Sequence, residues 1–297
     1  MDTSIYISNT KIQFVCGEEK KSGISVSAFK TVELPEETII NGVIVNEGRF
    51  DEAFQKITEV HPAPGGMSKV RLTIGSGQAL VKAKKIPKMP EAKVLQWMKG
   101  EFAEGESEDE EYLYDYEIMD IRKDGDIALL CAIKKSMLDS YVRIFRDAGI
   151  SLSCIDIGLN SQAKLVHKMP ATEGKTFLVL TIDGNMMDTV LYINGLFAVS
   201  NRSRILSERG SSDLGEEVAR TVSAMIQFNH AQKNEQSIDS IYMCGFRPDE
   251  DTVKEYVSGT YSLVLRNFKD DADIIEVYDQ DFYPDDYIYA VGNLIRE

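Results

Sequence analysis

The alternation of hydrophobic and polar positions near the start of the chain predicts three short strands. Apolar residues recur in the segments Ser4–Ile7, Lys11–Cys16 and Gly23–Glu33, and polar turns separate these segments. Runs of this length with turn residues between them are typical of an antiparallel meander. We therefore expect a three-stranded meander in this part of the chain.

A second segment with the same pattern occurs in the other half of the chain. Its apolar runs are Phe177–Ile182, Thr189–Ile193 and Leu196–Ile205. Asn194 and Gly195 join the last two runs, and this pair favours a hairpin because both turn positions require positive φ. The repetition predicts a duplicated α/β core with a cleft between the copies. The first turn of each meander is where such a core would hold phosphates.

The chain between the two meanders predicts alternating helices and strands. A helix is expected at Asp51–Glu59, and the prolines and glycines of His61–Gly66 predict a loop after it. Strands are expected at Val70–Ile74 and Gln78–Lys84. A helix that starts at Pro90 is expected next.

Later segments complete a predicted insert in the first lobe. Strands at Tyr112–Ile121 and Ile127–Ile133 and an amphipathic helix at Ser136–Ala148 complete this insert, for which we expect a βαββα order. Further along, Asp213 and Glu216 have the spacing of a capping box before a long helix. The expected parts are 1–67 (first-lobe core), 68–150 (insert), 151–170 (return helix of the first lobe) and 171–297 (second lobe).

The overall composition indicates a globular protein with an acidic surface. The chain has 297 residues, of which 43% are hydrophobic, and a net charge of −15. Nucleic acids and anionic lipid surfaces repel such a protein, so neither is an expected partner. No apolar run in the sequence approaches the roughly 20 residues that span a bilayer. We expect a cytoplasmic protein with no direct membrane insertion.

The cysteines, histidines and acidic residues predict no metal centre. The four cysteines lie far apart in apolar runs, which favours buried reduced thiols over a disulfide framework. The three histidines have no ligand spacing. The acidic stretch Glu104–Glu111 lacks the alternation with glycine that a calcium loop needs. No metal-binding residue is therefore expected.

Several segments, taken in their order and spacing, are similar to one known family. They are Leu34-Pro35, Ile40–Ile44, Val81-Lys82, Ile86–Met89, the helix around Trp97, Leu113–Ile118, Tyr141–Phe145, Asp147–Ile150, Ile155-Asp156 and Tyr289–Leu294. With these segments the sequence resembles PilM, the family of actin-like proteins of type IV pilus assembly. The place of the insert is also similar to that in PilM and in the FtsA division proteins.

The resemblance implies an α/β, actin-like (ribonuclease H-like) fold of two related lobes, with an FtsA/PilM-type insert in the first lobe. It also implies three nucleotide-binding elements: an Asp-Ile-Gly turn in each meander and a double glycine in the second lobe. The carboxylate of the first turn orients magnesium, and the glycines let backbone N–H groups approach the phosphates.

The first of these elements departs from the family pattern. Tyr6, Ile7 and Ser8 stand where the family has Asp-Ile-Gly, and Gln13 stands where it usually has lysine. A phenol stays protonated at neutral pH and does not replace a magnesium-binding carboxylate. Serine also lacks the freedom of glycine at positive φ.

The second and third elements depart as well. In Thr181–Gly184 the carboxylate and the glycine are displaced, and a slip of one residue in a strand sends Asp183 to the opposite face. Cys244 is followed by a single glycine and then by the large ring of Phe246. The degenerate equivalents of the nucleotide-binding residues are Ser8, Asn9, Asp183, Gly184, Asn185 and Gly245.

The second lobe is also expected to be smaller than in the family. Only a short loop rich in serine and glycine joins Ile205 to Asp213, where the family has a helical stretch. The helical subdomain of the second lobe would therefore be reduced to a single long helix. Together, these departures predict a pseudo-ATPase with no catalytic residue and no cofactor.

The resemblance implies a non-catalytic cytoplasmic scaffold of a type IV pilus or a related envelope assembly machine. In PilM proteins, a groove between the first-lobe core and its insert receives the short cytoplasmic tail of the membrane protein PilN. Here this groove would include strands near Val70–Ile74 and Gln78–Lys84. An acidic protein suits a tail with apolar anchors and a basic neighbour. Other pilus assembly components would be further partners.

Two alternatives stay open. One is an active actin-like ATPase that binds ATP or ADP with magnesium through atypical contacts from Asp183, Asn185, Asp188 and Gly245. The other is an FtsA-like filament former or membrane tether. Against the tether, no basic amphipathic helix follows the predicted core.

Arg202, Arg204 and Arg209 form a basic cluster in this acidic sequence. The cluster has two interpretations. It is either a site for phosphate or an acidic partner, or the solvated end of a strand that offsets nearby acidic residues.

Overall fold

The computed structural model describes residues 1–296 except 22, 60–68, 76, 78, 108, 233–235, 272 and 278, so the loop predicted at His61–Gly66 lies outside the described residues. The chain divides into two compact units. Unit 1 comprises Met1–Lys164, Glu276–Asp279 and Tyr289–Glu297, and unit 2 comprises the remaining residues from Leu165 onwards. The end of the chain thus belongs to unit 1, whereas the sequence predicted a second lobe that runs through residue 297.

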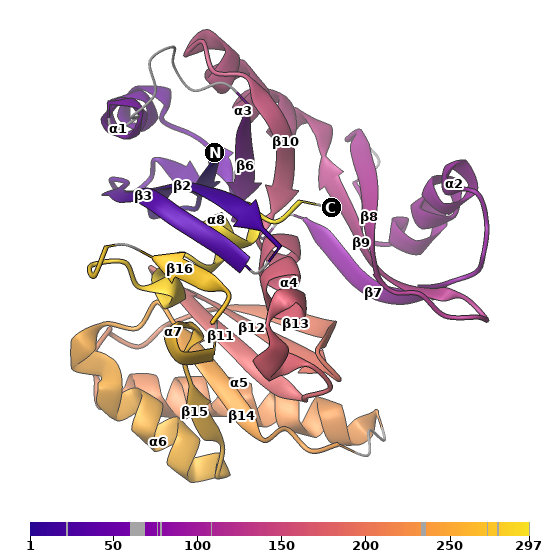
Figure 1. The fold of residues 1–297 in the computed structure, drawn as a ribbon, viewed down its shortest axis with the longest axis vertical. Coiled ribbons are helices and arrows are strands. Elements are labelled where there is room, and N and C mark those ends of the chain that lie inside the picture. Colours follow the sequence, from indigo (N-terminus) through magenta and orange to yellow (C-terminus); the bar gives the residue numbers. More distant parts are fainter. Residues whose placement is uncertain are drawn as a thin grey trace. The chain divides into compact units, whose positions relative to one another are not determined.

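Unit 1 is built on a six-stranded sheet with the strand order β10-β6-β1-β2-β3-β16 (Figure 1). β1 (Asp2–Ile7), β2 (Lys11–Lys20) and β3 (Gly23–Glu33) form the predicted antiparallel meander. β6 (Val70–Ile74) pairs in parallel with β1, and β10 (Leu152–Ile157) pairs in parallel with β6. The short strand β16 (Ile275–Val277) completes the other edge.

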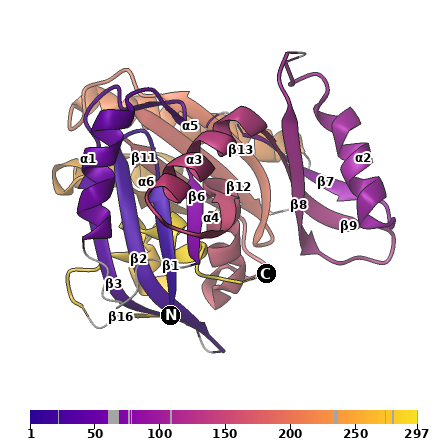
Figure 2. The ribbon, with the colours of Figure 1, turned by 90° about the horizontal axis from the view of Figure 1, so that it is seen from above.

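Two helices cover the apolar surface of this sheet. α1 (Glu47–Thr58) begins after Asn46, whose side chain accepts the N–H of Arg49 as an N-cap. Figure 2 shows α1 lying along the meander. α3 (Lys135–Asp147) buries four large side chains in the same core: Met137, Tyr141, Ile144 and Phe145. Burial stabilises the fold by about 1.5 to 3 kcal/mol for each large apolar side chain.

The hairpin of β4 (Ile39–Ile40) and β5 (Val43–Ile44) lies beside α3. The hydroxyl of Tyr141 donates a hydrogen bond of 2.7 Å to the carbonyl of Gly42, in the turn of this hairpin. The contact ties the connector after the meander to the helix that follows the insert.

The insert of unit 1 has a small sheet and a core of its own. Its strands β7 (Leu80–Ile86), β8 (Tyr112–Asp120) and β9 (Asp126–Lys134) have the order β7-β9-β8. α2 (Glu91–Phe102) packs on this sheet in a separate hydrophobic cluster (Figures 1 and 2). The predicted insert boundaries 68–150 were too wide. β6 belongs to the main sheet and α3 packs on the main core, because both continue the apolar surface of the core.

Unit 2 repeats the strand connections of unit 1. β11 (Phe177–Asp183), β12 (Met186–Ile193) and β13 (Leu196–Arg204) form the second predicted meander. β14 (Ser240–Cys244) pairs in parallel with β11, and β15 (Val264–Arg266) pairs in parallel with β14. The resulting order, β13-β12-β11-β14-β15, corresponds to β3-β2-β1-β6-β10. The predicted duplication of the core is confirmed.

Helices α5 (Ser212–Ala231) and α6 (Asp251–Tyr261) pack against each other and against the core of unit 2. The remaining helical segments are α4 (Gly158–Lys168), α7 (Phe268–Asp271), α8 (Ile288–Gly292) and the 3-10 turns Pro170–Thr172, Pro248–Glu250 and Pro284–Asp286. None of the helices among the described residues has the length and apolar character needed to cross a membrane.

The turn between β12 and β13 has the predicted geometry. Asn194 and Gly195 have φ values of 56° and 77°, and Ile193 pairs with Leu196 across the turn. Both turn residues are therefore left-handed, as a type I′ hairpin requires.

Candidate functional site

A groove in unit 1, which we call the insert groove, lies between the insert and the main sheet. It has a volume of about 440 Å³. Its lining consists of Ile74, Leu113–Glu117, Leu129, Cys131, Ile133, Leu138, Cys154–Ile157, Asn160 and Lys164. An apolar lining with few convergent polar groups is the usual composition of a ligand site.

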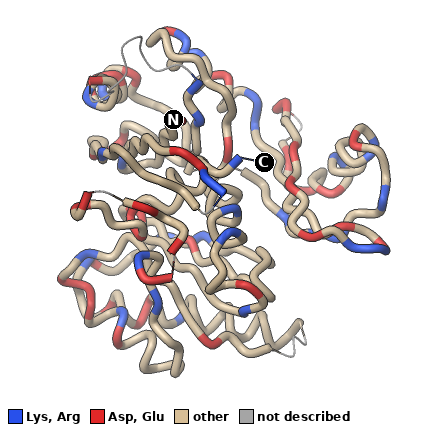
Figure 3. The backbone as a smooth tube through the Cα atoms, viewed as in Figure 1, with Lys and Arg blue, Asp and Glu red and all other residues tan. Residues whose placement is uncertain are grey.

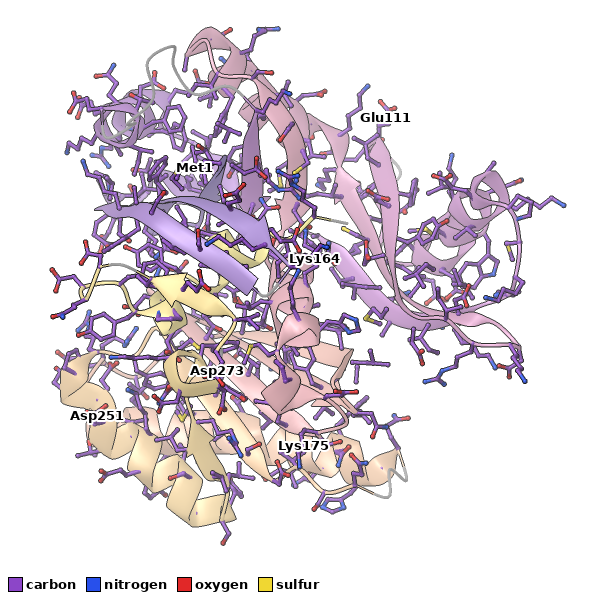
Figure 4. The ribbon with its side chains drawn as sticks, in the orientation of Figure 1. Met1, Glu111, Lys164, Lys175, Asp251 and Asp273 are labelled. Atoms are coloured by element: carbon purple, nitrogen blue, oxygen red, sulfur yellow. The ribbon has the colours of Figure 1, made fainter. Side chains whose placement is uncertain are left out.

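On the β10 side of the insert groove, an internal network holds Asp156. Its carboxylate accepts hydrogen bonds from the backbone N–H of Ile157 (2.8 Å), Asn160 Nδ2 (3.0 Å) and Ser161 Oγ (3.0 Å). Nζ of Lys164, which Figure 4 labels, lies 2.7 Å from Asp156 Oδ2. The Lys164 and Asp156 side chains are only 8% and 11% exposed. Both carboxylate oxygens are thus engaged by groups of the protein.

On the β8 side, the carboxylate of Asp115 is exposed. It accepts a hydrogen bond of 2.8 Å from the backbone N–H of the next residue, Tyr116. Among the described residues, this is its one hydrogen bond, and it has no ion pair. Figure 3 shows acidic residues, drawn in red, along β8. The Asp115 carboxylate therefore has, among the described residues, no counterpart of the cation that balances Asp156.

Cys131 of β9 lies in the apolar part of the insert groove. Burial, with smaller effects from Asp156 and Asp115, raises the pKa of its thiol to about 12. Cys131 therefore stays protonated at neutral pH and acts as a small apolar side chain. The four cysteines, all of them among the described residues, form no disulfide.

The sequence located only part of the insert groove. Of the two strand segments it named, Val70–Ile74 contributes Ile74, but the described residues 79–84 of Gln78–Lys84 contribute nothing to the lining. The reason is the strand order of the insert: β7 lies at the outer edge away from β8. The alternation of tyrosine and acidic side chains in Tyr114–Glu117 is the sequence signal that marks the β8 wall.

In unit 1, the turn between β1 and β2 satisfies its own backbone donors. Ser8 Oγ accepts hydrogen bonds of 3.2 Å from the N–H groups of Thr10 and Lys11. Asn9 Oδ1 accepts the N–H of Gly42 at 3.0 Å. In a phosphate-binding turn, such N–H groups point at the ligand. Here the side chain of Ser8 is already their acceptor.

Aromatic packing surrounds Tyr6, the residue that was predicted to stand in place of the first carboxylate. The Tyr6 side chain is buried, and its ring lies 4.8 Å from that of Tyr289, centroid to centroid. A Cβ atom at Gly75 would lie 2.6 Å from the Tyr6 hydroxyl, so this glycine provides room for the phenol. Gln13 is buried as well, and its Nε2 donates to Thr31 Oγ1 at 3.3 Å.

In unit 2, the corresponding turn is a tight hairpin. Asp183 pairs with Met186 across Gly184 and Asn185, and Gly184 has a φ of 59°. Glycine at the first turn position is typical of a type II′ hairpin. Gly184 and Asn185 are exposed at the tip.

Arg209 joins this turn to the end of β14. Its guanidinium donates to the carbonyl oxygens of Gly184 (3.2 Å) and Gly245 (3.1 Å). It also forms a bidentate pair with Glu250, in which Nε–Oε1 is 2.6 Å and Nη2–Oε2 is 2.5 Å. The Glu250 side chain is fully buried, and that of Arg209 is 15% exposed. A cation of the protein itself therefore connects the two glycine turns.

Backbone donors complete the environment of Glu250. Its carboxylate accepts the N–H groups of Gly210 (3.1 Å) and Arg247 (2.8 Å). Burial alone would raise the pKa of Glu250, but the hydrogen bonds from Arg209 and Arg247 outweigh burial and lower this pKa below its usual value.

Gly245 is required by packing within the protein. Its φ is 72°, and a Cβ atom there would lie 2.0 Å from the carbonyl oxygen of Ile182. The close approach of β11 and β14 thus explains this glycine without a ligand.

The three arginines of the predicted basic cluster do not act together. Arg202 Nη1 lies 3.2 Å from Asp188 Oδ2. Arg209 pairs with Glu250, whereas Arg204 is exposed. Burial raises the pKa of Asp188 to about 6, Arg202 opposes this shift, and Asp183 adds to it. The Asp188 carboxylate is therefore engaged by a side chain of the protein.

The loop between β13 and α5 is short and bonded to α5. Glu217 accepts the N–H groups of Leu206 and Ser207, each at 2.9 Å. The predicted capping box of Asp213 and Glu216 was wrong. The N-cap is Ser211, which makes no side-chain cap bond, and Asp213 lies inside the first turn. Carboxylates from α5 and from Glu250 fix the loop in its place.

The repeated meander and its parallel strands define the class of protein: the chain has the actin-like ATPase fold. It superimposes on the solved "PilM-PilN type IV pilus biogenesis complex" with a TM-score of 0.76, 14% identity and coverage of 99% of this chain and 97% of that chain. A Bacteroides thetaiotaomicron protein "with actin-like ATPase fold and unknown function" has a TM-score of 0.55 and 11% identity over 92% and 95%. No family model and no curated protein matches this sequence.

Proposed function

We propose that this chain is a non-catalytic scaffold of a type IV pilus or a related envelope assembly machine. In this proposal, the insert groove binds the short cytoplasmic tail of a PilN-like membrane protein, which recruits the chain to the inner face of the membrane. The insert groove is the observation that carries the proposal, because it is apolar and has one acidic wall. The likeness in fold to the PilM-PilN complex supports it.

We call the turns between β1 and β2 and between β11 and β12 the nucleotide-equivalent turns, because the resemblance places nucleotide-binding elements there. Their internal hydrogen bonds support the absence of catalysis. In unit 1, Ser8 already accepts the N–H groups of its turn, and buried Tyr6 replaces a carboxylate. In unit 2, Arg209 binds the carbonyl groups of Gly184 and Gly245. A phosphate would have to displace these internal hydrogen bonds. A magnesium ion would have to compete with Arg202 for the Asp188 carboxylate.

The experiment is a binding titration with a synthetic tail. The peptide carries alternating apolar residues followed by a basic residue, which is the chemistry that the proposal requires of a PilN-like tail. Fluorescence anisotropy measures its affinity for the wild-type chain and for two matched variants, Leu113→Glu in the insert groove and Val142→Glu on α3. The two residues are 42% and 44% exposed in the native chain.

We expect saturable binding that Leu113→Glu weakens and Val142→Glu leaves unchanged. Absence of binding, or equal loss in both variants, would refute the proposed role of the insert groove. Labelled ATP with magnesium, titrated in parallel, should show no micromolar binding. Such binding would support the active ATPase instead.

A further inference from the structure

Two strands present their edges to the insert groove. β8 lines it with the five consecutive residues Leu113–Glu117, and β10 lines it with the four consecutive residues Cys154–Ile157. Consecutive residues of a strand point to opposite faces, so a lining of consecutive residues is a strand edge. β9 instead contributes the alternate residues Leu129, Cys131 and Ile133, and therefore presents a face.

Both edges are unpaired within their sheets. β8 and β10 are the outer strands of the insert sheet and of the main sheet of unit 1. An outer strand leaves alternate N–H and C=O groups free to pair with another strand. In each of these edges, an aspartate accepts the N–H of the residue that follows it: Tyr116 in β8 and Ile157 in β10.

These two aspartates differ in how firmly they are held. Asp156 is nearly buried and also binds Asn160, Ser161 and Lys164. Asp115 is exposed, and its one hydrogen bond among the described residues goes to Tyr116. An incoming carbonyl group can replace Asp115 at this N–H at little cost, whereas Asp156 is fixed. The β8 edge is therefore the one that is available.

We infer that the insert groove binds its partner as an added β-strand, which pairs with the edge of β8. This inference rests on the proposed function and specifies how the insert groove binds its partner. Backbone pairing with β8 supplies affinity, and alternate side chains of the added strand supply specificity. Those directed at β9 meet the apolar face of Leu129, Cys131 and Ile133. When Asp115 releases Tyr116, its carboxylate accepts a basic side chain of the tail.

Backbone N-methylation of the synthetic tail tests this inference. One set of peptides is methylated singly at even positions of the bound segment and a second set at odd positions, with all side chains kept. In an added strand, only one parity of N–H groups points at β8. Methylation at that parity should weaken binding about tenfold for each lost hydrogen bond. The other parity is the matched control and should stay within about twofold of the parent peptide.

Amide hydrogen exchange gives a second measurement on the protein. When the unmodified tail binds, the N–H of Tyr116 should exchange more slowly. Its hydrogen bond to the exposed Asp115 side chain is then replaced by a backbone hydrogen bond to the added strand. The Asp156 cap should persist, so the N–H of Ile157 serves as the internal control and should keep its exchange rate.

The outcomes separate this inference from the proposed function. One outcome is that the tail binds, that Leu113→Glu weakens this binding, and that methylation at either parity leaves it unchanged. In that case recognition is by side chains, and the added strand is refuted. If both parities weaken binding equally, pairing with β8 alone is refuted. If the unmodified tail does not bind, the proposed function fails and this inference fails with it.

Discussion

The insert groove and the two nucleotide-equivalent turns differ in how their polar groups are satisfied. In the turns, Ser8 accepts two backbone N–H groups and Arg209 binds two carbonyl oxygens, so the protein supplies both partners of each bond. In the insert groove, the Asp115 carboxylate has one local hydrogen bond and no balancing cation among the described residues. Internal bonds that are already made oppose a ligand, whereas a weakly held group favours one.

The buried pair of Arg209 and Glu250 provides the largest test of this comparison. Glu250→Gln leaves the guanidinium without its charge partner in a buried place, so we expect a loss of about 3 to 5 kcal/mol in the free energy of unfolding. Urea denaturation followed by circular dichroism measures it. The control is Glu47→Gln in the exposed pair with Arg143, which should cost much less because solvent screens an exposed ion pair. Equal losses in the two variants would show that Arg209 does not hold the turns together.

The pH dependence of stability tests the environment of Asp188. Its pKa of about 6 in the folded chain lies above the unfolded value, so the folded state binds the proton more tightly. Its contribution to stability is therefore present below about pH 4 and is lost as the pH rises through about 6. Relative to Asp188→Asn, the wild-type chain should lose about 2 to 3 kcal/mol between pH 4 and pH 7.

Urea denaturation of both chains at several pH values measures this difference. The variant removes the titrating group but keeps a side chain of similar size. A constant difference between the two chains across this range would mean that Asp188 has an ordinary pKa and is better hydrated than the structure shows.

Substitution of the insert groove should affect binding more than stability. Leu113→Glu places a carboxylate in the apolar lining beside Asp115, so we expect a loss of tail affinity of at least about tenfold, or about 1.4 kcal/mol. Val142→Glu should keep the affinity within about twofold, and both variants should unfold within about 0.5 kcal/mol of the parent. Calorimetric titration with the synthetic tail measures the affinities.

The smallest expected effect concerns the first turn of unit 1. Ser8→Ala removes the acceptor of two backbone N–H groups, and we expect a loss of about 1 kcal/mol in stability. It should not create affinity for ATP with magnesium, because Tyr6 still occupies the place of the carboxylate. Appearance of such affinity would mean that Ser8 alone closes the site.

The repeated core could be predicted because its signals are local. Apolar alternation specifies each meander, and the Asn194-Gly195 turn marks the second one, without knowledge of the partner strands. The boundaries of the insert could not be predicted in this way. β6 and α3 resemble other amphipathic elements in sequence, and only the tertiary packing assigns them to the main core.

The candidate site was predictable to a lesser degree. From the resemblance we predicted that Tyr6 and Ser8 stand where the family has a carboxylate and a glycine, and that Gly184 and Gly245 correspond to later glycines of the pattern. The sequence did not show that Arg209 binds the carbonyls of both glycines, because residues about 25 and 36 positions apart meet only in the folded chain. The β8 wall was missed for a similar reason. In the sheet, β9 lies between β7 and β8, and this order differs from the order of the strands in the sequence.

The most direct measurement is a crystal structure of this chain grown with both the synthetic tail and ATP with magnesium. We expect the tail to be ordered in the insert groove beside β8, and Ser8 and Arg209 to keep their internal bonds. Ordered phosphates with a metal ion at the Ser8 turn or the Gly184 turn, and no tail in the insert groove, would refute the proposed function.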